Sequence, residues 1–550
     1  MQLIPQLRIP AHNLSAARNP TECVCADEEI MDRTVNGWPA RPVIYEVNTA
    51  IWLADLTRAA GRRVTLADVP DSAWDEVTPP GVDAVWLMGV WQRSPAGLEL
   101  AVANEGLQAS FRAALPGLRP EDVTGSPYCV RAYVADDAFG GPEALGAARA
   151  ALADRGARLI LDYVPNHVAP DHPWVESRPE LFVNGTESDL AAEPSEWLPA
   201  NGHILAHGRD PYFPPWPDVV QLNAFAPALR EATSATLADI ADQCDGIRCD
   251  MAMLMTNQVF AKTWGARAGE EPAEEFWPAV IAGLRARHPE TVLIAEAYWD
   301  MEWPLQQQGF DFCYDKRLYD RIMDGDVAGV RAHLTADFGY QSRLLRFLEN
   351  HDEPRVADRL RPEAGRAAAV AIATLPGATL WHEGQFEGRR VHPPVFLTRR
   401  PDENLDADLA DWYRRLLAAV ADQRIRTGGW QLLDVASWPD NDSSRNLLAW
   451  SWTGDEADGA DRHLVVVNFS PGAAQGRVRL GWPDLAGHSW QLTDPLSDVA
   501  FERAGDELAG PGLFVDLPPW QFHLLAVADV ADSERNRSAA APARGFTRTG

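Results

Sequence analysis

The sequence predicts an α/β protein: a (β/α)8 TIM barrel with a small inserted domain after strand 3 and a C-terminal antiparallel β-sandwich. Three observations support this fold class. Short apolar runs alternate with amphipathic stretches, one polar segment interrupts that alternation, and the last part of the chain changes to closely spaced alternating runs. With 550 residues, the chain exceeds the roughly 250–300 residues at which single cores stop growing, so more than one domain is expected.

Eight strand-like runs recur from about residue 42 onward, and they define the barrel. Between them lie Ala-, Leu- and Arg-rich stretches such as Glu143–Arg155, Pro227–Gln243 and Gly365–Thr374, whose 3.6-residue periodicity predicts helices. Strands that alternate with helices form parallel β/α units, and the active site of a barrel lies at the C-terminal ends of its strands. The runs are Val43–Val47, Val82–Met88, Leu159–Val164, Gly246–Arg248, Val292–Ala295, Phe310–Tyr314, Leu344–Leu348 and Ala378–Trp381.

Changes in composition along the chain predict the domain boundaries. Clusters of Pro, Trp, Gly and Asn break the β/α rhythm after the third run, and short alternating runs with turn residues replace the helices near the C-terminus. The expected organisation is an N-terminal extension over 1–40, a catalytic barrel over 41–166 and 224–421, an inserted domain over 167–223, a sandwich over 422–530, and a disordered tail over 531–550.

Composition narrows the classes of function. The formal net charge of −30 argues against nucleic acid and anionic membranes as partners, and the 21 Trp residues suit sugar binding. The start of the chain lacks the apolar core of a signal peptide, and no stretch is long enough to span a bilayer. Six scattered cysteines do not form a disulfide framework. We expect a cytoplasmic, reduced protein whose oligomeric state the sequence leaves open.

Four of the predicted strands end in polar residues that a buried core would not tolerate unpaired. Arg248 and Asp250 are two residues apart, so they share one face of their strand, and the guanidinium would keep the carboxylate ionised. Glu296 ends a strand of small and apolar residues, which raises the pKa of a carboxyl group. The other two clusters comprise Asp162, Asn166 and His167, and Asn350, His351 and Asp352.

These residue types match the chemistry of glycoside cleavage. A retaining enzyme needs an ionised carboxylate that attacks the sugar and a protonated one, about 5 Å away, that protonates the leaving oxygen. Asp250 fits the nucleophile, and Glu296 fits the acid/base. The remaining polar groups are Asp162, His167, His351 and Asp352. They would bind sugar hydroxyls, and these hydrogen bonds would strengthen as the sugar ring distorts. Asp352 is also counted as a catalytic residue, together with Asp250 and Glu296.

From about Val43 to Val527 the chain resembles the α-amylase family, glycoside hydrolase family 13. Its four signature segments occur in order: Asp162-x-x-x-Asn166-His167, Gly246-x-Arg248-x-Asp250, Glu296, and Asn350-His351-Asp352. Gln221-Leu-Asn223 is similar to the short signature of the inserted domain, and Tyr128 to the aromatic platform under the cleaved sugar. The resemblance implies an O-glycosyl hydrolase acting on α-glucans by a retaining mechanism, with Tyr128, Asp162, His167, Arg248 and His351 binding substrate.

One departure from the family pattern affects both metal and substrate. Many members carry Lys and His three and four positions after the nucleophile, where this chain has Met253 and Leu254. The change weighs against an endo-acting starch specificity and against the family's calcium site. Asn166, a calcium ligand in dependent relatives, is retained, although a calcium cage needs six to eight oxygen ligands. We expect no required cofactor, and calcium at Asn166 stays open as the alternative.

Three readings of function remain open. The first is hydrolysis of α-1,4-glucans or short maltooligosaccharides through a glycosyl intermediate on Asp250. The second passes the same intermediate to a sugar acceptor, as α-glucanotransferases and trehalose-forming relatives do. The third is a carbohydrate-binding relative without catalysis, since fold alone does not fix function. Such relatives usually lack a catalytic carboxylate, and none is missing here.

Overall fold

The computed structural model describes residues 37–422, 425–454, 462–497 and 499–531. Eight parallel strands close into a barrel in the order β1-β14-β13-β12-β11-β10-β5-β2. They are β1 (Val43–Asn48), β2 (Ala84–Met88), β5 (Arg158–Tyr163), β10 (Gly246–Cys249), β11 (Val292–Ala295), β12 (Phe312–Tyr314), β13 (Leu344–Arg346) and β14 (Ala378–His382). The predicted fold class is confirmed, and each strand overlaps one of the eight predicted runs.

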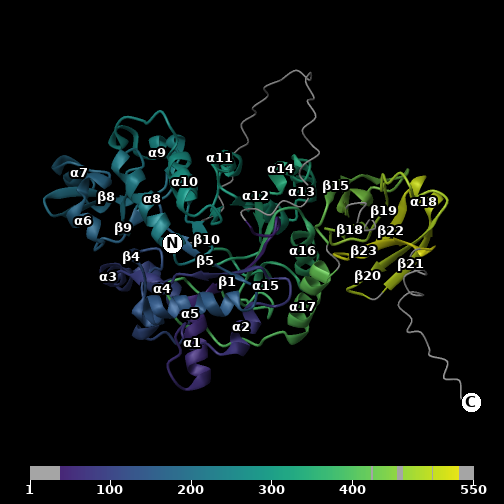
Figure 1. The fold of residues 1–550 in the computed structure, drawn as a ribbon, viewed down its shortest axis with the longest axis horizontal. Coiled ribbons are helices and arrows are strands. Elements are labelled where there is room, and N and C mark those ends of the chain that lie inside the picture. Colours follow the sequence, from purple (N-terminus) through teal and green to yellow (C-terminus); the bar gives the residue numbers. More distant parts are fainter. Residues whose placement is uncertain (1–36, 423–424, 455–461, 498, 532–550) are drawn as a thin grey trace, which may run out of the picture.

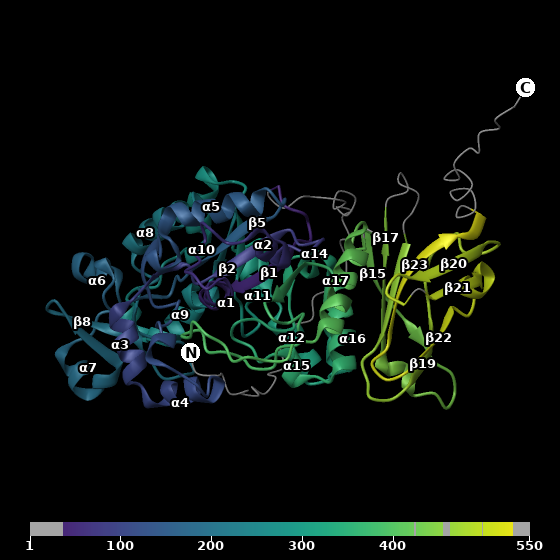
Figure 2. The ribbon, with the colours of Figure 1, turned by 90° about the horizontal axis from the view of Figure 1, so that it is seen from below.

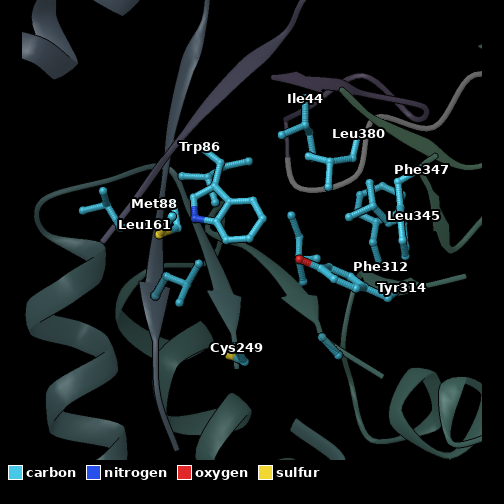
Figure 3. Close-up of a cluster of buried hydrophobic side chains, with 14 of the residues drawn as sticks. Ile44, Trp86, Met88, Leu161, Cys249, Phe312, Tyr314, Leu345, Phe347 and Leu380 are labelled. Atoms are coloured by element: carbon cyan, nitrogen blue, oxygen red, sulfur yellow. The ribbon is translucent and has the colours of Figure 1, made fainter. Parts of the chain in front are cut away.

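The barrel closes where its first strand meets its last. β1 pairs with β2 on one side and with β14 on the other, with Glu46 opposite His382. Figure 3 shows buried side chains from several of these strands gathered in one cluster, including Trp86 of β2, Tyr314 of β12 and Leu380 of β14. Every residue of β1 and β2 is buried, as expected for parallel strands covered on both faces.

Helices surround the barrel and alternate with its strands. α8 illustrates how the sequence sets their ends: it begins at Pro227, whose missing N–H costs nothing in the first turn. The helices are α1 (Thr49–Ala60), α2 (Asp71–Val77), α5 (Gly141–Ala153), α8 (Pro227–Ala241), α9 (Asn257–Trp264), α10 (Phe276–Arg287), α11 (Glu302–Gln307), α12 (Lys316–Met323), α13 (Val327–His333), α14 (Phe338–Gln341), α15 (Val356–Arg359), α16 (Pro362–Thr374) and α17 (Ala407–Asp422).

Two segments project from the barrel strands β2 and β5. The first, between β2 and α5, contains β3 (Trp91–Arg93), α3 (Pro95–Ala103), α4 (Glu105–Ala114) and β4 (Val130–Ala135), which the sequence analysis did not identify. The second follows β5 and forms a four-stranded sheet in the order β6-β9-β8-β7. Its elements are β6 (His167–Val168), α6 (Pro173–Ser177), α7 (Glu187–Ala192), β7 (Trp197–Ala200), β8 (His203–Gly208) and β9 (Trp216–Gln221).

The C-terminal part is an antiparallel sandwich of a six-stranded and a three-stranded sheet. Figure 1 shows it at the opposite end of the molecule from the inserted segment, and Figures 1 and 2 both show α16 and α17 between barrel and sandwich. The larger sheet contains, in order, β15 (Gly429–Leu433), β17 (Leu447–Thr453), β18 (Arg462–Asn468), β23 (Phe522–Asp529), β20 (Ser489–Asp494) and β21 (Val499–Ala504). The smaller sheet contains β16 (Val435–Ala436), β19 (Ala474–Val478) and β22 (Leu513–Leu517). A short helix, α18 (Gly505–Ala509), follows β21.

The larger sheet joins the sandwich to the barrel. Trp452 of β17 is fully buried, and its indole N–H donates a hydrogen bond of 2.7 Å to the carbonyl oxygen of Thr374 in α16. One face of β17 and β18 therefore belongs to the main core, whereas the other face packs with the smaller sheet in a second core. The sandwich is thus an attached part of the fold and shares apolar surface with the barrel.

Some expectations fall partly or wholly outside the described residues. These are most of the N-terminal extension, the tail after residue 531, and Cys23 and Cys25. The four cysteines within the described ranges are buried and free. Across those same ranges, no helix combines the length and the apolar character that crossing a bilayer requires.

Candidate active site

The site is centred on the guanidinium of Arg248, which lies fully buried near the end of β10. Its Nη1 lies 2.9 Å from Oδ1 of Asp250 and 3.5 Å from Oδ1 of Asp162. Its Nη2 lies 2.8 Å from Oε2 of Glu296. One cation therefore holds three carboxylates that belong to three neighbouring strands, and the structure brings these four predicted residues together.

Strand register and one unusual turn explain this arrangement. β10 lies between β5 and β11, with Arg248 opposite Asp162 and Ile294. After Asp250 the chain turns at Met251, whose φ of 38° is left-handed, a conformation that costs about 1–2 kcal/mol for a residue with a side chain. This turn directs the Met251 N–H to Oε2 of Glu296 at 2.6 Å. The backbone strain is thus used to orient the carboxyl group.

The two central carboxyl groups have raised pKa values. Burial raises the pKa of Asp250 to about 6, although Arg248 opposes the shift. Burial likewise raises the pKa of Glu296 to about 7, again against the effect of Arg248.

A second cluster surrounds His351, which lies beyond β13. Its Nε2 lies 2.6 Å from the hydroxyl of Tyr128 and 3.1 Å from Oδ2 of Asp352, and its Nδ1 lies 2.5 Å from Oε1 of Glu46. Burial lowers the pKa of His351, but Asp352 and Glu46 raise it by more, so the imidazole stays protonated. In turn, His351 outweighs the effect of burial on Asp352 and holds the pKa of that carboxyl well below its usual range.

Asp162 and Tyr128 both contact Arg248 and are held by further neighbours. Oδ2 of Asp162 accepts hydrogen bonds from the indole N–H of Trp86 at 3.2 Å and from the backbone N–H of Gly89 at 3.1 Å. The Tyr128 ring stacks on His351 with centroids 5.3 Å apart. The Arg248 guanidinium lies over both aromatic rings, 5.1 Å from Trp86 and 5.4 Å from Tyr128. These contacts hold Asp162 and Tyr128 in fixed positions.

His167 and Asn166 lie where β5 passes into the inserted segment. Burial lowers the pKa of His167 to about 4, so its imidazole is neutral, and the ring packs against Trp216 at 5.4 Å. The side-chain oxygen of Asn166 accepts a hydrogen bond of 2.8 Å from Gln221, whose own oxygen accepts one of 3.2 Å from Asn166. The Asn166 oxygen therefore already has a partner, and the ranges described hold no group of three His, Cys, Asp or Glu side chains suited to a metal.

Three contributors to the site were not recognised from the sequence. Glu46 accepts a hydrogen bond from His351, and the Tyr298 hydroxyl donates one of 2.7 Å to Oε1 of Glu296. The indole N–H of Trp86 donates a hydrogen bond to Asp162. A carboxylate inside the apolar run Val43–Asn48 was the one available signal for Glu46. Tyr298 follows Glu296 by two residues and carried no comparable signal.

Met253 and Leu254 are buried just after Asp250. They belong to a short 3-10 helix over Ala252–Met255 in which all four residues are buried. Their side chains form part of the main hydrophobic core. The side chains at these two positions therefore contribute packing and offer no polar group to a ligand.

Sequence comparison finds similar curated proteins, although no protein-family model matches the chain. An α-amylase of Haloarcula japonica is 28% identical over 448 residues, which cover 78% of this chain and 56% of the relative. An α-1,4-glucan:maltose-1-phosphate maltosyltransferase of Rhodospirillum rubrum is 25% identical over 476 residues, covering 81% and 60%. The chain thus spans little more than half the length of these relatives.

Solved structures show the same fold. A maltogenic α-amylase of Thermotoga neapolitana superposes with a TM-score of 0.62 at 18% identity, covering 88% of this chain and 98% of the other. An α-amylase of Geobacillus thermoleovorans, solved with acarbose, superposes with a TM-score of 0.62 at 15% identity, covering 91% and 100%. These structures confirm the fold, and the two sequence relatives confirm the resemblance to α-amylases and related α-glucan-active enzymes that the four sequence segments predicted.

Proposed function

We propose that this protein is a retaining glycoside hydrolase that cleaves α-glucosidic bonds of α-1,4-glucans or short maltooligosaccharides. One observation carries the proposal: a single buried guanidinium holds Asp250 and Glu296 beside each other, and burial raises the pKa of both carboxyl groups. A retaining enzyme needs this pair, one carboxylate ionised and one protonated. The names of the relatives, α-amylase and α-glucan maltosyltransferase, support an α-glucan as substrate.

In the first step the Asp250 carboxylate attacks the anomeric carbon, and the bond to the glycosidic oxygen breaks as Glu296 protonates that oxygen. A glycosyl ester on Asp250 and a free leaving sugar result. In the second step the ionised Glu296 accepts a proton from water, the water oxygen bonds to the anomeric carbon, and the Asp250 carboxylate is released. Each step moves one proton through Glu296, which therefore returns to its starting state.

The second cluster supports the sugar ring in this proposal. Tyr128 provides the stacking platform, and Asp352 and His351 bind ring hydroxyls as an ionised pair whose charges are already fixed. Asp162 and His167 bind further hydroxyls, and Arg248 keeps Asp250 ionised. Groups that are oriented before the substrate arrives stabilise the developing positive charge without reorganising. No cofactor takes part in these steps, and calcium at Asn166 would have a structural role only.

The proposal is tested with purified protein and a panel of maltooligosaccharides, trehalose and sucrose. Proton NMR of the fresh products should show release of sugars in the α-anomeric form before mutarotation. Release of the β-anomer would disprove retention, and no turnover of any α-glucoside would disprove the activity. The four free, buried cysteines in the described ranges support the reducing, cytoplasmic location that we propose with it.

A second candidate is transfer of the glycosyl group to a sugar acceptor. Two relatives named as maltosyltransferases, from Rhodospirillum rubrum and Bifidobacterium longum, favour it. Both reactions share the covalent intermediate and differ only in what attacks it. Chromatography of products at rising maltose concentration distinguishes them: longer oligosaccharides would show transfer, whereas shorter products alone would show hydrolysis.

A further inference from the structure

A pocket of about 390 Å³ opens among α11, α12, α13 and α14 and the loop that precedes α11. These helices cluster on one side of the barrel in Figure 1. The volume is within the range of about 300–1,000 Å³ for small-ligand sites. The pocket is lined by Asp300, Glu302, Trp303, Arg317, Arg321, His333 and Tyr340, none of which belongs to the two clusters of the active site.

We infer that this pocket is a second carbohydrate site, which binds glucosyl units of an α-glucan chain while the active site acts elsewhere on the polymer. The inference rests on the proposed function for the identity of the sugar. The existence of the site does not depend on the proposed function, because the observations that support the site do not involve Asp250 or Glu296.

Two aromatic rings form the apolar part of the pocket. Trp303 is 54% exposed, the largest value among the exposed large apolar side chains of the described residues. Its ring centroid lies 6.1 Å from that of Tyr340, and the planes are inclined by 59°. An indole left open to water beside a pocket presents a flat apolar surface with a polar edge, which suits the C–H face of a pyranose. The tilted phenol closes one side of that surface.

Glu302 supplies a buried polar group at the base of the pocket. It is only 4% exposed yet lines the pocket, and among the described residues no other side chain forms a hydrogen bond or ion pair with its carboxyl group. Burial raises the pKa of Glu302 to about 8, so the group is neutral near pH 7 and has a proton to donate. The Glu302 carboxyl group already accepts a hydrogen bond from its own backbone N–H, and its remaining hydrogen-bonding positions suit a sugar hydroxyl.

The charges around the pocket favour a neutral ligand over an anion. Arg317 is neutralised by Asp300, to which its Nε donates at 2.8 Å. His333 is paired with Asp315, 3.0 Å away. Arg321 is the remaining cation of the lining, and it offers N–H donors to hydroxyl groups. A phosphate or carboxylate ligand would meet the Asp300 carboxylate and the field of a chain with a formal net charge of −30.

Affinity electrophoresis in gels containing soluble starch tests the site, alongside hydrolysis of a short chromogenic α-glucoside. Trp303→Ala changes an exposed residue, so the fold should be kept. We expect its starch dissociation constant to rise about tenfold while hydrolysis of the short substrate stays within twofold of wild type. Glu302→Ala should weaken retention in the same direction. Trp438→Ala is the matched control, because Trp438 is also exposed, at 38%, but lies in the sandwich.

Each outcome bears on the inference. Unchanged starch retention in Trp303→Ala, or loss in Trp438→Ala instead, would overturn it. Relief of retention by inorganic phosphate but not by maltoheptaose would also overturn it, because the pocket would then be an anion site. If the wild-type protein hydrolyses no α-glucoside but its retention still depends on Trp303, the proposed function fails and the second site stands.

Discussion

Nη2 of Arg248 lies 2.8 Å from Oε2 of Glu296, and Nη1 of the same guanidinium lies 2.9 Å from Oδ1 of Asp250. Each carboxyl group therefore senses the other through a shared cation. Loss of a proton from one changes the energy of losing a proton from the other. The chemistry proposed for this site depends on that coupling, and several expected outcomes follow from it.

Asp250→Asn should abolish turnover while leaving the protein folded. The amide keeps the volume of the side chain and an oxygen near Arg248, but it cannot form the glycosyl ester. We expect kcat on a chromogenic α-glucoside to fall by about 10³-fold or more, with an unchanged thermal transition in circular dichroism. Activity above a few per cent of wild type would exclude Asp250 as the nucleophile.

The dependence of kcat/KM on pH should be bell-shaped with a narrow maximum between about 6 and 7. The activity is lost as pH falls below the Asp250 value of about 6, because the nucleophile becomes protonated. It is lost as pH rises above the Glu296 value of about 7, because the acid loses its proton. Initial rates from pH 4 to 9 measure both limbs. A profile that falls on one side only would show that Asp250 and Glu296 do not act as nucleophile and acid.

Tyr298→Phe should move the alkaline limb of that profile to higher pH. The Tyr298 hydroxyl donates to Oε1 of Glu296 and stabilises its ionised form. Removing a hydrogen bond worth about 1 kcal/mol should raise the pKa of Glu296, and with it the midpoint of the alkaline limb, by roughly 0.5–1 pH unit. Tyr163→Phe is the control, since its hydroxyl contacts Thr233 at 3.1 Å and no catalytic group. Equal shifts in both variants would rule out a specific role for Tyr298.

Activity should survive removal of metal ions. The Asn166 side-chain oxygen is occupied by Gln221, and Met253 and Leu254 are buried among apolar groups. After dialysis against EDTA we expect at least about nine tenths of the activity to remain. The comparison is with the same protein after calcium is restored. A reversible loss that calcium repairs would establish the calcium site that this prediction leaves out.

Trp452→Ala should destabilise the whole fold. The side chain is fully buried between sandwich and barrel, and its N–H is bonded to Thr374. Large-to-small changes at buried aromatic residues typically cost about 3–5 kcal/mol. Urea unfolding measures the change, with Trp438→Ala, on the exposed face of the sandwich, expected within about 0.5 kcal/mol of wild type. Equal losses in the two variants would mean that Trp452 does not join the domains.

The barrel could be predicted because both faces of its strands are buried. Parallel strands of this kind appear as short continuous apolar runs, and the chain contains eight of them between helical stretches. The position of Arg248 and Asp250 followed from the same rule, since polar residues that end such a strand must lie at the barrel mouth. The strand β3 was missed, because it is only three residues long and does not alternate clearly.

Partners that lie far apart in the chain could not be predicted. Glu46 stood out only as a charge in an apolar strand, and nothing near it indicated that His351 would be its partner. The left-handed turn at Met251 was equally hidden, because Gly or Asn, the residues that usually signal such a turn, are absent from that position. The local sequence pattern predicts individual helices and strands, whereas contacts between residues far apart in the chain depend on how the whole barrel closes.

The bond between Glu46 and His351 joins residues 305 positions apart, and this separation bears on biosynthesis. β1 is made early, yet its second partner, β14, ends at His382. Until that strand has left the ribosome, β1 keeps an open edge that can pair with the wrong chain. Fragments shortened before β14 should therefore be both inactive and prone to aggregate, and chaperones would meet this chain mainly in that interval.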